Sequence, residues 1–293
     1  MFQQKSFEAQ STGTLYLVPT PIGNLEDMTF RAVRILKEVD LIASEDTRNT
    51  QKLLNHFEVH TSQQSFHEHN SHERIGQLIE RLEEGQDIAQ VSDAGMPSIS
   101  DPGHDLVVAC IEAGISVVPL PGANAALTAL IASGLSPQPF YFYGFLPRKK
   151  KDQVEALEEL NLRPETFILY ESPHRLKEVL KNMGTVLGEN RKIVLCRELT
   201  KRYEEFIRGS VEEVQEWAQN SEIRGEFCVI VEGNSEGSLF PEEDMSWQEL
   251  TIKEHVTQLM EENNLSSKEA IKEVAKIRDM KKQEVYSNYH ELI

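Results

Sequence analysis

The sequence predicts an α/β protein with two α/β domains and a small all-α domain at its C-terminal end. Apolar, strand-like runs alternate with amphipathic helical runs from residue 12 to residue 135, which is typical of a mostly parallel sheet. A Gly/Pro-containing segment at 134–139 interrupts this rhythm before a second series of strands begins. Beyond a Gly/Ser/acidic linker at 234–246 the pattern is purely helical. We therefore expect domains at 12–135, 136–234 and 247–293.

The composition excludes several classes of protein. The formal net charge of −18 argues against broad adhesion to nucleic acid, although a local basic patch can still bind it. Cys110, Cys196 and Cys228 are widely spaced and lack a C-x-x-C pair, which predicts neither a disulfide framework nor a zinc site. The polar start does not resemble a signal peptide, and no apolar run approaches the ~20 residues that span a bilayer. We expect a soluble, cytoplasmic protein.

The first strand, at 14–18, runs into the loop Pro19–Leu25, which contains two prolines and Gly23. This is where a doubly wound fold often has a ligand loop, but the loop lacks the G-x-G-x-x-G pattern and is a weak signal alone. The following helix should bury Met28, Ala32, Ile35 and Leu36. A second strand, at 40–44, should end in Glu45–Arg48 before a short helix.

The segment from His56 to His72 holds five of the nine histidines. Among them, His67, His69 and His72 could ligate a metal ion. Their spacing matches neither H-E-x-x-H nor a zinc finger, so we favour solvent-facing residues or polar contacts to a substrate.

The central feature is the loop Val91–Gly103, between a strand at 87–91 and a helix that starts near residue 103. Its small residues, two prolines and two carboxylates leave the backbone open to a ligand. Asp101 before Pro102 is typical of a helix N-cap. Asp93 lies in mid-loop, where a carboxylate can accept hydrogen bonds from a ligand, and is the stronger functional candidate.

A helix at 73–84 should be followed by Gly85 as its C-terminal cap, and a strand at 115–120 should lead to the small-residue segment Pro121–Ala125. Small residues here allow the close approach either of a ligand or of the next helix to a sheet, and the residues alone leave both readings open.

The second domain begins with an aromatic strand at 140–147, which is followed directly by four cations, Arg148, Lys149, Lys150 and Lys151. Cations at a helix N-terminus oppose the helix dipole, so a phosphate-facing role is at least as favourable as a solvated helix start. Later strands, at 166–171 and 192–196, end in polar segments, and Ser172–Pro173 should begin a helix. Ser210 and Glu213 form a capping-box pattern.

The C-terminal pattern predicts three helices. The second should start at a capping box of Ser266 and Glu269 and turn Ala270, Val274 and Ile277 inward. The helix-turn-helix spacing and the cations of this segment suggest nucleic-acid contact, although small helical appendages also serve dimerisation or packing. The cations are Lys268, Lys272, Lys276, Arg278, Lys281 and Lys282.

Seven short motifs occur in one order along the chain. They are Pro19–Leu25, Ser44–Arg48, Ser92–Pro97, Ser100–Gly103, Pro121–Ala123, Gly144–Pro147 and Glu171–Arg175. Together they resemble the RsmI family, the ribosomal RNA small subunit methyltransferase I enzymes of the tetrapyrrole-methylase (class III) superfamily. The resemblance covers essentially the whole chain.

The resemblance implies a homodimer with S-adenosylmethionine in the cleft between two α/β domains and no required metal. It implies 2′-O-methylation of a cytidine ribose, cytidine 1402 of 16S rRNA, with the 30S subunit as substrate. Arg148–Lys151 and the C-terminal helices would contact RNA. The implied cofactor contacts are Pro21, Ile22, Gly23, Asp93, Ala94, Gly95, Met96, Ala123, Asn124, Phe145 and Leu146, which favours the ligand reading of the 121–125 segment.

Four residues near predicted strand ends are candidates for catalysis: Glu171, Arg175, Glu198 and Lys201. A ribose hydroxyl must lose its proton as it attacks the methyl group, so a base or a cation nearby is useful. Lys201 fits a base if its pKa is lowered and a phosphate clamp if it is not. Two other functions fit the sequence less well. A small tetrapyrrole substrate leaves the basic segments without a purpose, and a DNA-binding regulator leaves the cleft unexplained.

Overall fold

The computed structural model describes residues 3–6, 11–67, 70–99, 101, 103–235, 250–262, 265–278 and 280–290, except the side chains of 261 and 262. The chain divides into two compact units, Met1–Gly237 and Ser238–Ile293. Among the described residues, no helix is both long and apolar enough to cross a membrane. The first unit contains two five-stranded sheets, and the second is helical, which confirms the predicted fold class.

The first sheet is entirely parallel, with the strand order β3-β2-β4-β1-β5. Its strands are β1 (Thr14–Leu17), β2 (Leu41–Ser44), β3 (Gln63–Ser65), β4 (Ile88–Val91) and β5 (Ser116–Pro119). The strands are short and apolar because both faces are covered, and alternate residues point to opposite faces. Ile42 and Ala89 thus join one core cluster, whereas Ala43 and Ile88 join the other.

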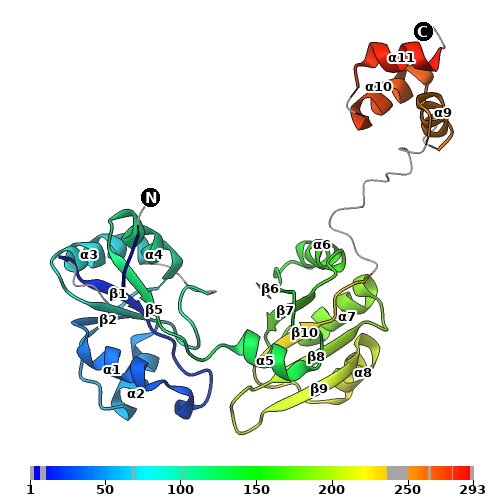
Figure 1. Cartoon of the computed structure of the whole chain (residues 1–293). Helices are drawn as coiled ribbons and strands as arrows, with labels where there is room; N and C mark the ends of the chain where they lie inside the picture. The colour runs from blue at the N-terminus through cyan, green and yellow to red at the C-terminus, as the bar shows by residue number, and fades with distance from the viewer. Residues whose placement is uncertain are drawn as a thin grey trace. The chain divides into compact units, whose positions relative to one another are not determined.

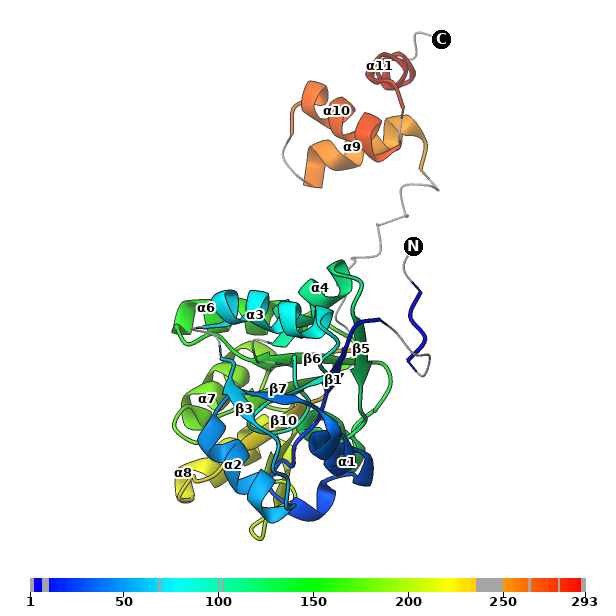
Figure 2. The ribbon, with the colours of Figure 1, turned by 90° about the vertical axis from the view of Figure 1, so that its left-hand side faces the viewer.

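Helices cover both faces of this sheet (Figures 1 and 2). On one face lie α1 (Phe30–Glu38), preceded by the short 3₁₀ helix η1 (Leu25–Asp27), and α2 (Thr47–His56). On the other lie α3 (Ser71–Glu83) and α4 (Gly103–Glu112). Asp101 caps α4 by accepting a hydrogen bond from the Gly103 N–H at 2.8 Å, as predicted. Pro102, the predicted first helical residue, lies outside the described residues.

The second sheet is mixed, with the order β6-β7-β10-β8-β9. Its strands are β6 (Phe140–Phe145), β7 (Thr166–Glu171), β8 (Lys192–Arg197), β9 (Glu205–Ser210) and β10 (Phe227–Val231). Only the β6–β7 pair is parallel. One face is covered by α6 (Lys150–Asn161), α7 (Leu176–Leu187) and α8 (Val211–Asn220). The predicted capping box of Ser210 and Glu213 is present at the start of α8.

The opposite face of the second sheet is covered by α5 (Ala125–Ser133), which follows β5 of the first sheet in the chain (Figure 1). Ala126 and Ala129 face Val194 and Ile230, and their small side chains let the helix approach the strands closely. The chain therefore crosses from one sheet to the other through α5, which links the loop after β5 to the second sheet.

The second unit consists of α9 (Ile252–Glu262), α10 (Ser267–Ile277) and α11 (Lys282–Tyr289), drawn in Figure 2 in orange to red. The capping box of Ser266 and Glu269 is present, as predicted. The prediction that Ile277 faces inward is wrong, because this last residue of α10 is 42% exposed. Ile271 fills the core instead, beside Val274 and Val285.

Candidate functional site

A cavity of about 520 Å³ lies between loops of the two sheets. A cavity of this size is typical of a small-molecule site. The first sheet contributes residues that follow β1, β2, β4 and β5, and the second contributes residues at the ends of β6, β7, β8 and β10. The lining includes Ile22, Glu45, Ala94, Gly95, Met96, Asp101, Asn124, Phe145, Tyr170, Glu171, Glu198, Lys201 and Glu226.

The loops after β1 and β4 are joined where they reach the cavity. Thr20 and Gly95 exchange two backbone hydrogen bonds, each 3.0 Å long. Gly95 has φ +80°, a left-handed conformation that favours glycine, and a Cβ there would lie 3.4 Å from Cγ2 of Ile22. Gly95 lines the cavity together with its neighbours Ala94 and Met96.

Of the predicted cofactor-binding residues, the cavity wall contains Ile22, Ala94, Gly95, Met96, Asn124 and Phe145. Pro21, Gly23 and Asp93 line a second, smaller cavity of about 250 Å³. The two cavities share the residue Ser92. Ala123 and Leu146 line neither cavity, and Leu146 is 2% exposed in the core under the second sheet. Ala123 contributes only its carbonyl oxygen, close to Gly95.

Asp93, which we predicted to bind a ligand, is held by the segment after β2. Its Oδ1 accepts a hydrogen bond from the Asp46 N–H at 3.2 Å, and its Oδ2 accepts one from Asn49 Nδ2 at 3.4 Å. In return, the Asp93 N–H donates to Oε2 of Glu45. Asp93 therefore connects the loop after β4 to the segment after β2. Glu45 lines the main cavity, whereas Asp93 does not.

Lys201 lies in the wall of the cavity between two carboxylates. Its Nζ donates to Glu198 Oε1 at 3.0 Å and to Glu226 Oε2 at 2.9 Å. Burial alone would lower the pKa of Lys201, but the hydrogen bonds to Glu226 and Glu198 outweigh it, so the net pKa is raised. Lys201 is therefore a cation at neutral pH, which favours a clamp over a base.

Two glycines make room for this arrangement. A Cβ on Gly23 would lie 2.3 Å from Cγ of Lys201, so the lysine stem packs directly on the loop after β1. A Cβ on Gly225, which has φ +83°, would lie 2.5 Å from Cγ of Glu198. Glu198 itself has φ +50° and Thr200 has φ +66°, which is uncommon for residues with a side chain. The backbone strain of this turn is concentrated next to the cavity, as is common at functional sites.

Glu171 and Arg175 form the other charged pair. Glu171 is 3% exposed, and its Oε1 accepts a hydrogen bond from the Ser172 N–H at 2.7 Å. Its Oε2 has only Arg175 Nη2 nearby, at 3.4 Å, with no hydrogen bond. Burial raises the pKa of Glu171, and the Ser172 N–H and Arg175 reduce that rise without cancelling it. Glu171 lines the cavity, whereas Arg175 does not.

The helix after β7 begins later than we predicted, since α7 starts at Leu176 and Ser172–Arg175 form a turn. The turn lets Arg175 point back toward the end of β6. Its Nη2 donates to the carbonyl oxygens of Leu146 and Pro147, both at 2.9 Å. Arg175 thus connects Glu171 to the loop that precedes the Arg148–Lys151 run.

Sequence reasoning missed several residues of the cavity wall, notably Glu45, Tyr170 and Glu226. Tyr170 is stacked edge-to-face on Phe145, with 5.5 Å between ring centroids, and burial raises the pKa of Tyr170 to about 12. Glu45 also has a raised pKa, because burial and the nearby Asp93 and Asp101 outweigh the hydrogen bond from the Asp93 N–H. Glu45 directly follows the strand β2, and this position at a strand end could have predicted its place in the cavity wall. Nothing in the sequence singles out Glu226.

The histidine segment does not form a metal site among the described residues, where no three His, Cys, Asp or Glu side chains gather as a metal ion requires. His69 lies outside the described residues.

The profile of the tetrapyrrole (corrin/porphyrin) methylases matches residues 14–215, which include the first sheet, the strands β6 to β9 of the second sheet and most of the cavity wall. A solved structure with the same fold is uroporphyrin-III C-methyltransferase from Thermus thermophilus complexed with S-adenyl homocysteine. It has a TM-score of 0.54 and 19% identity, over 75% of this chain and 97% of that one. The fold and the cavity thus define a tetrapyrrole methylase.

Curated relatives narrow the family further. The chain is 56% identical over 289 residues to ribosomal RNA small subunit methyltransferase I of Halalkalibacterium halodurans, which covers 99% of both chains. It is also 56% identical over 289 residues to the protein of that name from Bacillus subtilis, over 98% of both chains. The chain belongs to the ribosomal RNA small subunit methyltransferase I family, which confirms the resemblance seen in its motifs.

Proposed function

We propose that this protein transfers a methyl group from S-adenosylmethionine to the ribose 2′-oxygen of a cytidine in small-subunit rRNA, cytidine 1402 of 16S rRNA. The observation that carries the proposal is the carboxylate-rich cavity in a chain of this family. Among the described residues, five carboxylates and one cation, Lys201, line it. The carboxylates are Glu45, Asp101, Glu171, Glu198 and Glu226.

This lining fits the methyl donor, whose sulfonium and ammonium groups are positive. Lys201 offsets one of the two charges of Glu198 and Glu226, and Arg175 lies 3.4 Å from Glu171, so the carboxylates of the wall outnumber the cations that pair with them and favour a cationic ligand. Burial raises the pKa of Glu45, Asp101 and Glu171, because a charged carboxylate is poorly solvated there, and a bound cation would relieve that cost. When bound, S-adenosylmethionine supplies an electrophilic methyl group. Ala94–Met96 on the loop after β4 and Asn124 on the loop after β5 would hold it.

Glu171 is the residue that we assign as general base. A ribose hydroxyl becomes a better nucleophile as its proton leaves, and a carboxylate with a raised pKa accepts that proton more readily than an ordinary one. Oε2 of Glu171 is buried and accepts no hydrogen bond from the described residues, and it is the oxygen to which we assign the proton. Arg175 keeps the carboxylate in place through their 3.4 Å contact and its bonds to the loop after β6.

Lys201 and Glu198 have a different part in the proposal. Lys201 follows β8, and its stem packs on Gly23 in the loop after β1. Its ammonium group can therefore bind a phosphate or ribose oxygen of the substrate. Glu198 and Glu226 orient it, because both accept a hydrogen bond from the same Nζ. Positioning of this kind can contribute on the order of several kcal/mol to a transfer step.

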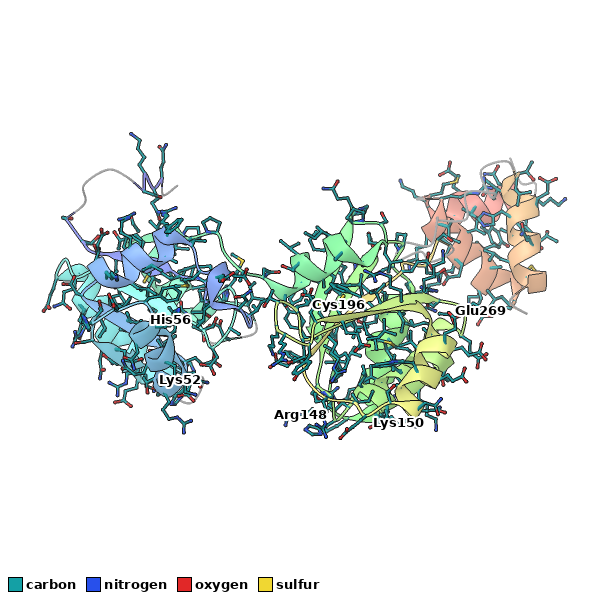
Figure 3. The ribbon with its side chains drawn as sticks, turned by 90° about the horizontal axis from the view of Figure 1, so that it is seen from below. Lys52, His56, Arg148, Lys150, Cys196 and Glu269 are labelled. Carbon is teal, nitrogen blue, oxygen red and sulfur yellow. The ribbon has the colours of Figure 1, made fainter. Side chains whose placement is uncertain are left out.

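The RNA contacts of the proposal lie outside the cavity. Arg148, Lys149 and Lys150 are exposed and have no carboxylate partner among the described residues, whereas Lys151 pairs with Glu155 at 3.6 Å. Figure 3 shows Arg148 and Lys150 at the outer edge of the second half. In the C-terminal unit Lys268, Lys272 and Lys276 are exposed along α10.

One predicted RNA contact has a structural role. Arg278 is only partly exposed, and it donates to Nδ1 of His255 at 3.1 Å and to the Leu250 carbonyl at 2.7 Å. We leave it out of the proposed RNA surface.

In this proposal the protein is a homodimer and acts in the cytoplasm, where small ribosomal subunits are found. An apolar surface on α5 supports a second copy, since Ile131 is 80% exposed and Leu127 is 47% exposed. Large exposed apolar side chains that share a helix face favour a protein contact.

The test is transfer of tritiated methyl from S-adenosylmethionine to 30S subunits, with free 16S rRNA and a porphyrin precursor in parallel. Digestion to nucleosides locates the label, which we expect in a 2′-O-methylated cytidine. Label in the porphyrin precursor, or label in RNA on a base rather than on a ribose, would contradict the proposal. A Lys201→Ala variant that turns over normally would remove Lys201 from it.

A further inference from the structure

Two cations and a histidine form a stripe on the outer face of α2. Arg48, Lys52 and His56 follow each other at intervals of four residues, so they project from one side of the helix. All three are exposed, and Lys52 has no ion pair among the described residues. Figure 3 labels Lys52 and His56 on this helix. The stripe is about 12 Å long at the rise of an α-helix.

The middle of the stripe borders the smaller of the two cavities described above. Lys52 and Asn49 line the smaller cavity of about 250 Å³, together with Gly23 and Ser92. Ser92 belongs to the main cavity as well, and Gly23 carries the stem of Lys201 on its other side. Lys52 therefore lines a cavity that adjoins the main cavity at Ser92.

One end of the stripe opens into a groove of about 630 Å³ between α1 and α2. His56 and Phe57 form one wall, and Phe30, Arg34 and Lys37 belong to the other. Phe30 is 99% exposed, which no packing requirement explains. An exposed aromatic ring beside cations is a stacking platform for a nucleobase.

This surface is close to neutral in a chain whose net charge is −18. Its cations Arg34, Lys37, Arg48 and Lys52 are matched in number by the carboxylates Glu38, Asp46, Glu58 and Asp93. Two of its carboxylates are already paired, because Glu38 forms an ion pair with Arg34 and Asp46 forms one with Arg48. Glu58 remains at the far end of the groove and Asp93 in the smaller cavity, where Asn49 donates to it. Among the described residues, Lys52 and Lys37 are the cations of this surface without an ion pair.

We propose that this surface, Arg48, Lys52, His56, Lys37 and Phe30, binds the single-stranded RNA next to the target nucleotide. Lys52 contacts a backbone phosphate near the cavity, and Phe30 stacks on a base further along the strand. The inference rests on the proposed function for the identity of the RNA. The partner class comes from the pairing of an aromatic ring with cations on a surface next to the cavity that adjoins the main one.

The experiment compares Phe30→Ala and Lys52→Ala with matched controls on the opposite face of the first sheet. Ile111→Ala on α4 removes another exposed apolar side chain, and Arg81→Ala on α3 removes another exposed cation. Each protein is assayed for methyl transfer to 30S subunits and for binding of a labelled single-stranded oligocytidylate over a range of salt. Affinity for S-adenosylmethionine and thermal unfolding are measured alongside.

We expect Phe30→Ala to weaken RNA binding roughly tenfold, the effect of losing one stacked base, and Phe30→Trp to restore it. Lys52→Ala should lower the salt dependence of binding by about one phosphate contact. kcat/KM for 30S subunits should fall in parallel, while cofactor affinity stays that of the wild type. Ultraviolet crosslinking should attach RNA to the peptide that carries Phe30.

Two outcomes would overturn the inference. In the first, the wild type methylates rRNA and the stripe variants behave like the controls. In the second, Phe30→Ala changes the oligomeric state, which would show that a second copy covers the groove. A wild type that binds RNA through Phe30 but transfers no methyl to it would instead defeat the proposed function and leave the binding surface intact.

Discussion

Glu171→Gln is the substitution that separates chemistry from folding most cleanly. The amide has the shape of the carboxyl and keeps an oxygen to accept the hydrogen bond from the Ser172 N–H. Arg175 keeps its two carbonyl partners, so it does not become an unpaired buried cation. What is lost is the ability to take a proton. Loss of a general base typically costs roughly 10²–10⁴ in rate, and we expect kcat for methyl transfer to fall by that factor.

The stability of the same variant should change in the opposite direction. The folded pKa of Glu171 lies above its ordinary value of 4.5, mainly because the carboxyl is buried, so the native state binds the proton more tightly than the unfolded chain. Stability from this group is therefore full below the unfolded pKa and is lost as pH rises through the folded pKa. At about pH 7 the wild type carries this penalty and the glutamine does not. We expect the variant to unfold at the same temperature as the wild type or at a higher one.

The assay is single-turnover transfer of tritiated methyl to 30S subunits, with donor affinity measured by calorimetry and unfolding followed by heat. Glu216→Gln, on the exposed side of α8, controls for the removal of a charge from the same half of the chain. In the wild type, log(kcat/KM) should rise with pH and level off above the Glu171 pKa, and this limb should vanish in the variant. A turnover within about threefold of the wild type, at unchanged donor affinity, would refute the assignment.

Three further substitutions test the surroundings of the site. Gly103→Ala should destabilise the protein by about 1–3 kcal/mol in chemical denaturation, because the new Cβ would lie 1.8 Å from Nε2 of buried Gln90. Lys201→Met should raise the substrate KM, because its cation is lost, and leave the acid limb of the pH profile in place, since Lys201 is not the base. Ser210→Ala should lower the free energy of unfolding by about 1 kcal/mol without affecting turnover, because it removes the capping box of α8.

The fold could be predicted where the signal is local. Apolar runs such as Leu41–Ser44 and Ile88–Val91 are buried on both faces, so their composition reveals parallel strands directly. The capping boxes at Ser210 and Ser266 depend on two side chains three residues apart, and both are present. The start of α7 was predicted wrongly because Ser172–Pro173 has the sequence pattern of a helix cap. The hydrogen bonds from Arg175 to the carbonyl oxygens of Leu146 and Pro147 are tertiary contacts, which this local pattern does not reveal.

The site could be predicted only in part, for a related reason. Loops that end parallel strands converge on one edge of a sheet, and this rule found Ile22 and Ala94–Met96. The second sheet is mixed, and its antiparallel pairing brings the residue before β10 beside the residue after β8. Glu226 thereby meets Glu198 and Lys201, a contact that depends on register and not on spacing along the chain.

The distribution of charge explains how an acidic protein could serve an RNA substrate. Carboxylates dominate the main cavity, which suits a cationic donor and repels phosphates, so a strand that reaches it would present a ribose hydroxyl and keep its backbone outside. The cations that can hold that backbone are at its edge, at Lys201 and Lys52, and farther out at Arg148–Lys150. Raising salt should then weaken RNA binding much more than donor binding, because only the outer contacts are exposed to screening. An equal loss of both affinities in a salt titration would contradict this division of charge.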